Sequence, residues 1–317
     1  MQKSFELSII IPLYNEEESL ETLQKWISKS LEGKASSFEV IFIDDGSTDG
    51  SWKIIKSLSN EYDEVKAIRF SKNYGKSQAL HAGFNAAKKE YVATLDADLQ
   101  DSPEELPKMV QALKENSLDL ISGWKKKRFD SLLLKNLPSK LFNWAARRVS
   151  GIKLHDFNCG IKVYRQDVIK NIDLHGEMHR YIPVLASQEG FRNIGEQVVQ
   201  HQPRRFGQTK FGADRFLKGF LDLITLWFIN RFGKRPMHFF GLWGTIMLLF
   251  GFGFILFLGI DKLYFDTNAR LITERPEFYI ALTLMLLGSQ FFIAGFLGEL
   301  VLRNSRKTSR YNIKETL

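Results

Sequence analysis

The first hundred residues alternate short apolar runs with amphipathic stretches. Four runs rich in β-branched and aromatic residues predict β-strands at 7–12, 39–44, 65–70 and 91–96. Patterns of helical period lie between these runs, at 16–31, 51–58 and 76–87. Pro103 suits the first turn of a further helix. Strands that alternate with crossover helices predict an α/β fold with a mostly parallel sheet.

Two long stretches near the C-terminus, residues 239–260 and 278–298, contain no charged side chain. As helices, each would be about 30 Å long, which matches the hydrocarbon core of a bilayer. We therefore expect a hairpin of two transmembrane helices, although the mean hydropathy of the whole chain is slightly negative. The N-terminus runs directly into an apolar strand, so we expect no signal peptide. The single cysteine, Cys159, excludes an internal disulfide and fits a reducing compartment.

Basic residues flank this hairpin on both sides. Those before the first span are Arg231, Lys234 and Arg235, and those after the second are Arg303, Arg306, Lys307 and Arg310. The connecting loop, residues 261–277, carries three basic residues against four acidic ones. The positive-inside rule therefore predicts a multi-pass protein of the cytoplasmic (inner) membrane, with the N-terminal domain and both termini in the cytoplasm.

The segment 213–232 precedes the first span and is too charged to cross a bilayer. Its apolar residues recur at helical spacing: Leu217, Phe220, Leu221, Ile224, Trp227, Phe228 and Phe232. This pattern, with basic flanks, predicts a helix in the headgroup region that contacts anionic membrane lipids. Residues 130–148 have a similar character, divided at Pro138. The alternative for both segments is an ordinary helix packed against the sheet.

These patterns divide the chain into four parts. We expect a cytoplasmic domain at 1–212, an amphipathic interfacial helix and juxtamembrane linker at 213–237, the transmembrane hairpin at 238–303, and a basic cytoplasmic tail at 304–317.

Unusual residue clusters follow each of the four predicted strands. In chain order they read YNEEE, DDGSTD, SKNYGK and DADLQD. Because the carboxyl ends of parallel strands share one edge of a sheet, and ligands bind there, these clusters predict a single site. Residues 44–51 alone would also fit a turn and a helix cap, but that explanation does not account for Asp44 and Asp45 together at a strand end.

The acidic cluster at 96–101 contains the clearest chemistry. Asp96 and Asp98 are separated by one small residue, and Gln100 adds a third oxygen. The chain has a net charge of +8, so concentrated acid suggests a bound cation. Hard oxygen ligands suit Mg²⁺ or Mn²⁺, whose remaining positions are typically filled by substrate phosphates. The alternative is a solvated loop with a helix N-cap.

Six motifs, in order, carry a resemblance to a known family: SIIIPLYNEEESL, IDDGSTD, NYGKSQALHAG, LDADLQD, HDFNCGIKVYR and RRFGQTK. Essentially the whole chain resembles the family 2 glycosyltransferases with the GT-A fold, specifically the polyprenyl-phosphate group that includes dolichol-phosphate-mannose synthase. The resemblance implies an inverting enzyme of cell envelope glycan biosynthesis. It would move one sugar from a UDP- or GDP-linked donor to polyprenyl (undecaprenyl or dolichyl) phosphate at the cytoplasmic membrane face.

The same resemblance implies the site residues. Those around the donor nucleoside would be Pro12, Tyr14, Glu16, Asp44 and Asp45. The metal and the donor diphosphate would be held by Asp96, Asp98 and Gln100. The loop after the third strand would contribute Asn73, Gly75 and Lys76, and the family's R-x-x-G-x-[ST]-K loop corresponds to Arg204, Gly207, Thr209 and Lys210. The implied catalytic residues are Asp98, Asp156, Arg204 and Lys210.

Two positions depart from the family pattern. Many members have arginine where this chain has Lys125 and Lys162, and lysine keeps the charge but not the bidentate phosphate geometry. A lipid phosphate acceptor is already anionic and needs relief from charge repulsion rather than a strong base, so both lysines are candidates for that role. Asp156 could orient the nucleophile or a basic residue, or it could be a structural cap.

Other functions fit less well. Residues 202–206 differ by one residue from the Q-x-x-R-W signature of processive polysaccharide synthases, but two spans are too few for a polymer channel. An intact D-x-D pair argues against a non-catalytic membrane scaffold. The basic run at 125–128 lies in no recognised nucleic-acid module, so no nucleic-acid partner is expected. The histidines show no metal-ligand spacing, and a homo-oligomer is left open.

Overall fold

The computed structural model describes residues 5–126, 143–144, 146–148, 150–174, 178–203, 224–225, 227–228, 231–233, 235–265, 271–304 and 313–316. The chain forms two compact units. One comprises Met1–Trp227 with Thr308–Leu317, and the other comprises Phe228–Lys307.

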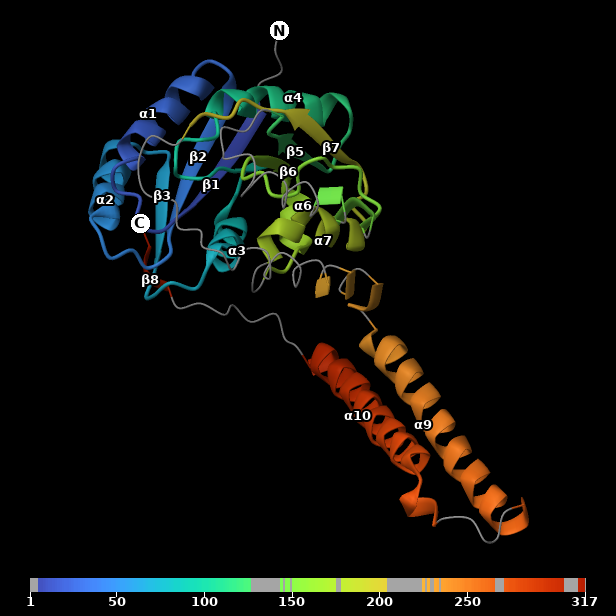
Figure 1. The fold of residues 1–317 in the computed structure, drawn as a ribbon. Helices are drawn as coiled ribbons and strands as arrows, with labels where there is room; N and C mark the ends of the chain where they lie inside the picture. The colour runs from blue at the N-terminus through green and yellow to red at the C-terminus, as the bar shows by residue number, and fades with distance from the viewer. Residues whose placement is uncertain are drawn as a thin grey trace. The chain divides into compact units, whose positions relative to one another are not determined.

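The first unit is built on one mixed β-sheet (Figure 1). Its strands are β1 (Phe5–Leu13), β2 (Ala35–Asp44), β3 (Val65–Phe70), β4 (Tyr91–Thr94), β5 (Leu120–Trp124), β6 (Lys162–Arg165), β7 (Ile194–Val198) and β8 (Ile313–Thr316). They lie in the order β7-β5-β6-β4-β1-β2-β3-β8. β1 pairs in parallel with β2 and β4, as do β2 with β3 and β5 with β7. Only β6 and β8 run antiparallel to neighbours among the described strands, so the predicted mostly parallel sheet is confirmed.

Helices cover both faces of this sheet (Figure 1). On one face lie α1 (Leu20–Leu31), α2 (Ser51–Glu61) and α4 (Leu106–Glu115), and on the other lie α3 (Lys76–Ala86), α6 (Gln166–Asn171) and α7 (Ile182–Gln188). Successive side chains of a strand point to opposite faces, so Ile9 and Ile11 pack with the first group and Ile10 with the second. Burial on both faces explains why the strands read as continuous apolar runs.

A hydrogen-bonded carboxylate lies within this apolar core. The carboxylate of Glu39 on β2 accepts hydrogen bonds from Ser8 Oγ at 2.6 Å and from the backbone N–H of Lys88 at 2.9 Å, and it pairs with Lys66. Burial alone would raise the pKa of Glu39, but these three partners outweigh burial and lower it.

The predicted elements match the observed ones with shifted ends. Residues 65–70 coincide with β3, whereas the first helix begins at Leu20 rather than residue 16. Pro103 opens a short 3₁₀ helix, η1 (Pro103–Glu105), that leads into α4. β4 ends at Thr94, so the acidic cluster lies wholly in the following loop.

The second unit contains two long apolar helices, α9 (Pro236–Ile260) and α10 (Pro276–Asn304). Between them lie a π-helical turn, η4 (Asp261–Phe265), and the 3₁₀ turn η5 (Ile272–Glu274). Candidate spans run through Pro236–Phe265 and Pro276–Leu302, and in each 17% of the most apolar window is buried. A Cβ at Gly244 would lie 2.7 Å from the Gly288 carbonyl oxygen, so glycine permits this close helix contact.

Part of the segment expected to form a basic cytoplasmic tail, residues 304–317, is a β-strand in the structure. Ile313–Thr316 forms β8, which lies at one edge of the sheet and pairs antiparallel with β3. This strand could not be predicted from apolar periodicity, because pairing at the edge of a sheet depends on backbone hydrogen bonds, which the side-chain pattern does not reveal.

Candidate active site

The D-x-D loop follows β4 at the carboxyl edge of the parallel strands. Leu99 has a positive φ of 59°, and Asp98 Oδ1 accepts the Gln100 backbone N–H at 3.2 Å. Asp96, Asp98 and Gln100 are half-buried, and Asp96 Oδ1 pairs with the Lys76 ammonium at the start of α3. The structure therefore brings together residues that the sequence placed in two different motifs.

Charge controls the ionisation of Asp96. Burial would raise the pKa of its carboxyl group, but the charge and hydrogen bond of Lys76, with Lys125 and Lys162 nearby, lower it to about 2. The carboxylate is therefore ionised throughout the neutral range, as a metal ligand must be.

A glycine forms the wall behind this loop. A Cβ at Gly160 would lie 2.5 Å from Asp96 Oδ2 and 3.0 Å from Asp101 Oδ2. Thr94 Oγ1 donates to the Gly160 carbonyl oxygen at 2.8 Å and fixes the glycine against β4. Gly160 belongs to the HDFNCGIKVYR motif, but its role could not be predicted from the sequence, because only the fold brings it against Asp96.

The two lysines that depart from the family pattern lie beneath the acidic loop. Lys125 Nζ is 2.6 Å from Asp101 Oδ1, and Asp101 is 1% exposed. Burial would raise the pKa of Asp101, but Lys125 and His201 lower it. Lys162 Nζ donates to the Cys159 carbonyl oxygen, and burial lowers its pKa below the ordinary lysine value. Both cations therefore lie close to the D-x-D carboxylates in the folded chain.

The loops after β1 and β2 interlock beside this cluster. Asn15, with φ of 55°, donates its backbone N–H to Ser47 Oγ at 2.9 Å, and Glu16 donates its own to Ser51 Oγ at 3.0 Å. Thr48 in turn donates its backbone N–H to Asn15 Oδ1 at 2.9 Å. The two motifs predicted to surround a nucleoside thus form one continuous wall.

Asp44 and Asp45 are buried within this wall, at 0% and 4% exposure. Asp45 accepts the backbone N–H groups of Tyr74 at 2.7 Å and Gly75 at 2.9 Å, and burial raises its pKa. Asp44 Oδ1 accepts the Ser47 backbone N–H at 2.8 Å. Both carboxylates hold loops in place, and their contact with a nucleoside stays a prediction, as do those of Pro12 and Tyr14.

Gly75 shows why the third loop requires glycine. Its φ is 95°, a conformation that L side chains rarely adopt, and it positions Lys76 at the first turn of α3. The neighbouring Asn73 is exposed.

Asp156 is the residue that the family resemblance suggests near the acceptor. It is 1% exposed, and its Oδ1 accepts the Asn158 backbone N–H at 3.1 Å, while its own N–H donates to Glu196 Oε1 at 3.0 Å. His155 bonds the same glutamate through Nδ1 at 2.6 Å and stacks on Trp124. These contacts fit the structural alternative for Asp156 and leave its catalytic role a prediction.

His179 is a neighbour that the sequence reading gave no site role. Its Nδ1 lies 3.2 Å from Ser77 Oγ on α3, one residue beyond Lys76. Burial, followed by the charges of Lys76 and Arg180, lowers its pKa to about 3. A neutral imidazole therefore borders the cationic cluster at neutral pH.

The R-x-x-G-x-[ST]-K loop, with Arg204, Gly207, Thr209 and Lys210, lies outside the described residues, as do 130–142 and most of 213–232. Residues 201–203, which precede that loop and are described, contact the D-x-D loop directly. Gln202 donates its backbone N–H to the Gln100 carbonyl oxygen at 2.9 Å, and Asp101 and His201 form an isolated β-bridge.

The metal prediction fits the donor set but rests on few protein ligands. Among the described residues, no three His, Cys, Asp or Glu side chains converge as a metal cluster. Gln100 Nε2 donates to the Gln202 carbonyl oxygen at 3.5 Å, so the amide oxygen of Gln100 points away from Gln202. Two carboxylates and one amide oxygen suit a hard cation whose other ligands come from substrate.

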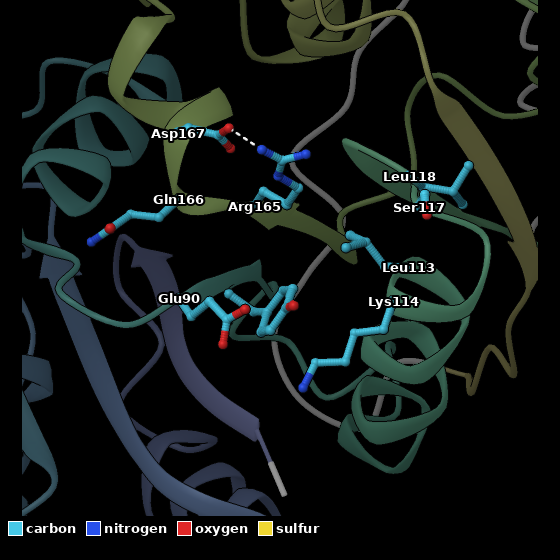
Figure 2. Close-up of a pocket in the computed structure, with 9 residues that line it drawn as sticks. Glu90, Leu113, Lys114, Ser117, Leu118, Arg165, Gln166 and Asp167 are labelled. Atoms are coloured by element: carbon cyan, nitrogen blue, oxygen red, sulfur yellow. Dashed lines mark hydrogen bonds and ion pairs between the residues drawn. The ribbon is translucent and has the colours of Figure 1, made fainter. Parts of the chain in front are cut away.

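A cavity of about 470 Å³ lies elsewhere on the sheet (Figure 2). Its wall includes Tyr91 and Arg165, which pair across β4 and β6 at the edge opposite the D-x-D loop. Arg165 is paired with Asp167 and Asp119, and Lys114 lies 4.9 Å from the Tyr91 ring. The lining also includes Glu90 and Asp167, which balance Lys114 and Arg165, so this cavity carries no excess of cationic charge to favour a phosphate.

An α/β sheet with a D-x-D loop, lysines and interlocked loops at one edge defines a GT-A glycosyltransferase domain. Residues 8–173 match the family model "Glycosyl transferase family 2", and the chain belongs to this family.

Named relatives match nearly the whole chain. It is 36% identical to dodecaprenyl-phosphate galacturonate synthase from Rhizobium johnstonii, over 95% of this chain and 89% of that protein. It is 34% identical to undecaprenyl-phosphate 4-deoxy-4-formamido-L-arabinose transferase from Shewanella sediminis, over 98% and 92%. In fold, it is similar to glucosyl-3-phosphoglycerate synthase from Mycobacterium tuberculosis solved with Mn²⁺ and UDP, with a TM-score of 0.55, 18% identity, and coverage of 71% and 80%. The family resemblance, the GT-A fold and the mostly parallel sheet predicted from the sequence are confirmed.

Proposed function

We propose that the protein transfers one sugar from a nucleotide sugar to polyprenyl phosphate, with inversion, at the cytoplasmic face of the membrane. The observation that carries this proposal is the cluster of Asp96, Asp98 and Gln100 with three lysines at the carboxyl edge of the sheet. The named relatives act on dodecaprenyl or undecaprenyl phosphate, which supports the same acceptor class here.

Each part of the site has a task in this reaction. The wall formed by the 44–51 loop and residues 12–16 would receive the nucleoside. Asp96, Asp98 and Gln100 would hold Mg²⁺ or Mn²⁺, which supplies positive charge to the departing diphosphate when bound. Lys76 contacts Asp96 through its ammonium group, so it would also lie beside the donor diphosphate. UDP and GDP remain alternatives for the nucleotide.

Lys125 and Lys162, with Arg204 and Lys210 from the following loop, would reduce repulsion between the anionic acceptor and the donor. The acceptor phosphate is the nucleophile and is already ionised, so the protein has to align it rather than deprotonate it. Asp156 would orient a basic residue on that side.

Membrane topology follows from the sheet itself. β1 precedes the apolar hairpin and β8 follows it, yet both belong to one sheet. The two flanks therefore lie in the same compartment, which supports an even number of crossings. The basic flanks support the cytoplasm as that compartment. Residues 213–232 would hold the site at headgroup height against anionic lipids.

The test uses the full-length protein in detergent, a panel of UDP- and GDP-sugars, and undecaprenyl phosphate. We expect release of nucleoside diphosphate that requires both the lipid phosphate and a divalent cation. Release that is unchanged in excess chelator, or that is independent of the lipid phosphate, would contradict the proposal.

A further inference from the structure

The strand that follows the membrane hairpin reaches the donor-side loops through a series of contacts. β8 pairs with β3 so that Glu315 lies opposite Arg69, and Thr316 lies opposite Ile68. Arg69 is the residue of β3 that contacts the wall predicted to receive the nucleoside. The register thus places the C-terminal strand directly beside the support of that wall.

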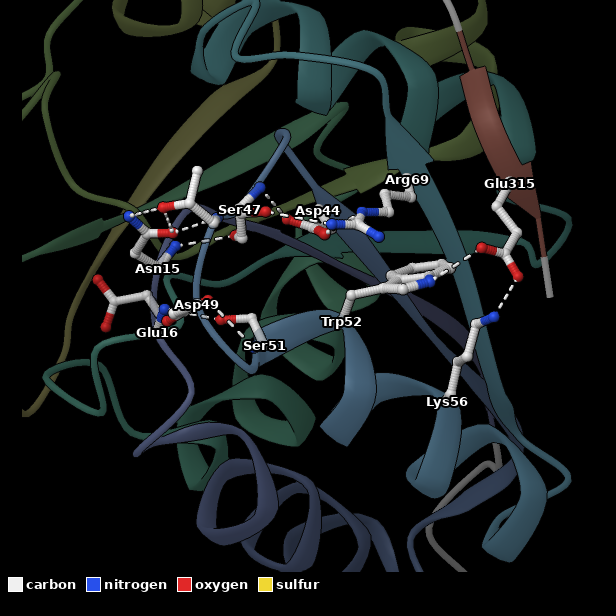
Figure 3. Close-up of polar contacts among 11 residues, drawn as sticks. Asn15, Glu16, Asp44, Ser47, Asp49, Ser51, Trp52, Lys56, Arg69 and Glu315 are labelled. Carbon is white, nitrogen blue, oxygen red and sulfur yellow. Dashed lines mark hydrogen bonds and ion pairs between the residues drawn. The ribbon is translucent and has the colours of Figure 1, made fainter.

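Glu315 is the residue of β8 that binds the side chains beneath it. Its Oε2 accepts the indole N–H of Trp52 at 3.0 Å, and its other oxygen pairs with Lys56 (Figure 3). The hydrogen bond from Lys56 lowers the pKa of Glu315, so the carboxylate stays ionised. Lys314 and Thr316 on either side are exposed.

Trp52 connects Glu315 to Arg69. It is 6% exposed, and the guanidinium of Arg69 lies 5.5 Å from its ring centroid, within cation–π distance. The hydrogen bond to Glu315 fixes the orientation of the Trp52 ring, and the face of this ring in turn restrains the Arg69 guanidinium.

Arg69 then holds the loop. Its Nη2 donates to the Ser47 carbonyl oxygen at 3.2 Å, and its Nε is 3.2 Å from Asp44 Oδ2, a carboxylate with no exposed surface. The same loop receives the Asn15 backbone N–H through Ser47 Oγ (Figure 3). The contacts thus run without a break from Glu315 to the β1 loop.

We propose that Glu315 is a positioning residue for donor binding, which acts through Trp52 and Arg69 to fix the 44–51 loop around the nucleoside of a nucleoside diphosphate. This inference rests on the proposed function. Edge protection of β3 would require only the backbone pairing of β8, whereas this role requires the Glu315 side chain.

The experiment measures UDP and GDP binding to the full-length protein in detergent with Mn²⁺, followed by donor KM and kcat. Glu315→Ala is expected to weaken binding of the preferred nucleotide about tenfold and to raise donor KM equally, with kcat within twofold. Glu315→Gln keeps an oxygen acceptor for Trp52 and should recover most of the affinity. Lys314→Ala, on the same strand, is the matched control and should bind as the wild type does.

A double variant tests the route. Trp52→Phe removes the indole N–H, so Glu315→Ala combined with Trp52→Phe should weaken binding no more than the stronger single change. Hydrogen exchange should show faster exchange at residues 44–51 in Glu315→Ala, with β1 unchanged, which separates local loosening from unfolding.

The outcomes distinguish the two proposals. If the wild type binds neither nucleotide, the proposed function fails and this inference fails with it. If the wild type binds one and Glu315→Ala binds it within twofold, or if the two changes are additive, only the positioning role is wrong. Loss of β1 protection in Glu315→Ala would also overturn it, in favour of a purely structural strand.

Discussion

Gly160 allows the most direct test of the site geometry. Gly160→Ala adds one methyl group, and the backbone there needs no positive φ, so the local fold can accept alanine. The new Cβ would lie 2.5 Å from Asp96 Oδ2, whereas ordinary contact begins at 3.4 Å. The carboxylate oxygen must therefore move by about 0.9 Å. Because the obstructing atoms belong to the carboxyl groups of Asp96 and Asp101, we expect displacement of these side chains, mainly Asp96, rather than unfolding.

A displacement of this size is sufficient to damage catalysis. Misplacement of a reacting group by about 1 Å can cost about 100-fold in rate. We expect kcat/KM to fall by about that factor, measured as initial rates of nucleoside diphosphate release across a Mn²⁺ titration. The urea midpoint should stay near that of the wild type. Gly259→Ala, whose Cβ would meet nothing within 4 Å, is the control.

A Gly160→Ala enzyme that is folded and within threefold of the wild-type rate would contradict this expectation. Asp96 would then tolerate displacement, and its assignment as a metal ligand would lose its support.

Three further predictions concern charge. Asp98→Ala should abolish transfer without changing the unfolding midpoint, because the half-buried carboxylate is proposed to bind the metal rather than to pack in the core; retained activity would contradict this. Lys125→Met should lower the unfolding free energy by about 3–5 kcal/mol, since it leaves Asp101 buried without its ion-pair partner, and adding Asp101→Asn should restore most of it. Glu39 has a lowered pKa in the folded state, so its ionised form stabilises the fold. This contribution to the unfolding free energy is fully present above pH 4.5, the ordinary pKa of the group, and is lost as pH falls through the folded-state pKa. Urea unfolding between pH 6 and 3 should therefore show a steeper loss for the wild type than for Glu39→Gln, and equal slopes would count against the Lys66 contact.

Much of the fold was predictable because its signals are local. The apolar runs of β1 to β4 are buried on both faces, and the loops between them carry glycine and carboxylate residues at fixed positions. β8 has no such signal, since Ile313 is its one apolar residue and the strand pairs with β3 at the edge of the sheet. The antiparallel β6 was also missed, because Lys162–Arg165 is short and its neighbours β4 and β5 are distant in sequence.

The site was predictable in residue type but not in contact. Sequence motifs identified Asp96 and Lys76 separately, and only the fold shows that they form an ion pair. Lys125 was expected to face phosphate, but its partner in the structure is Asp101. Such pairings depend on long-range packing, which no local pattern records.

The proposed reaction joins one sugar to a lipid phosphate. Its product is observed by mass spectrometry of the lipid after incubation of the full-length protein with undecaprenyl phosphate, Mn²⁺ and the donor panel. We expect one new species, the acceptor plus a single sugar residue with its phosphate retained, that is absent with Asp98→Ala. A ladder of added sugars would indicate a processive synthase, and free sugar with unmodified lipid would indicate hydrolysis; either result would contradict the proposed function.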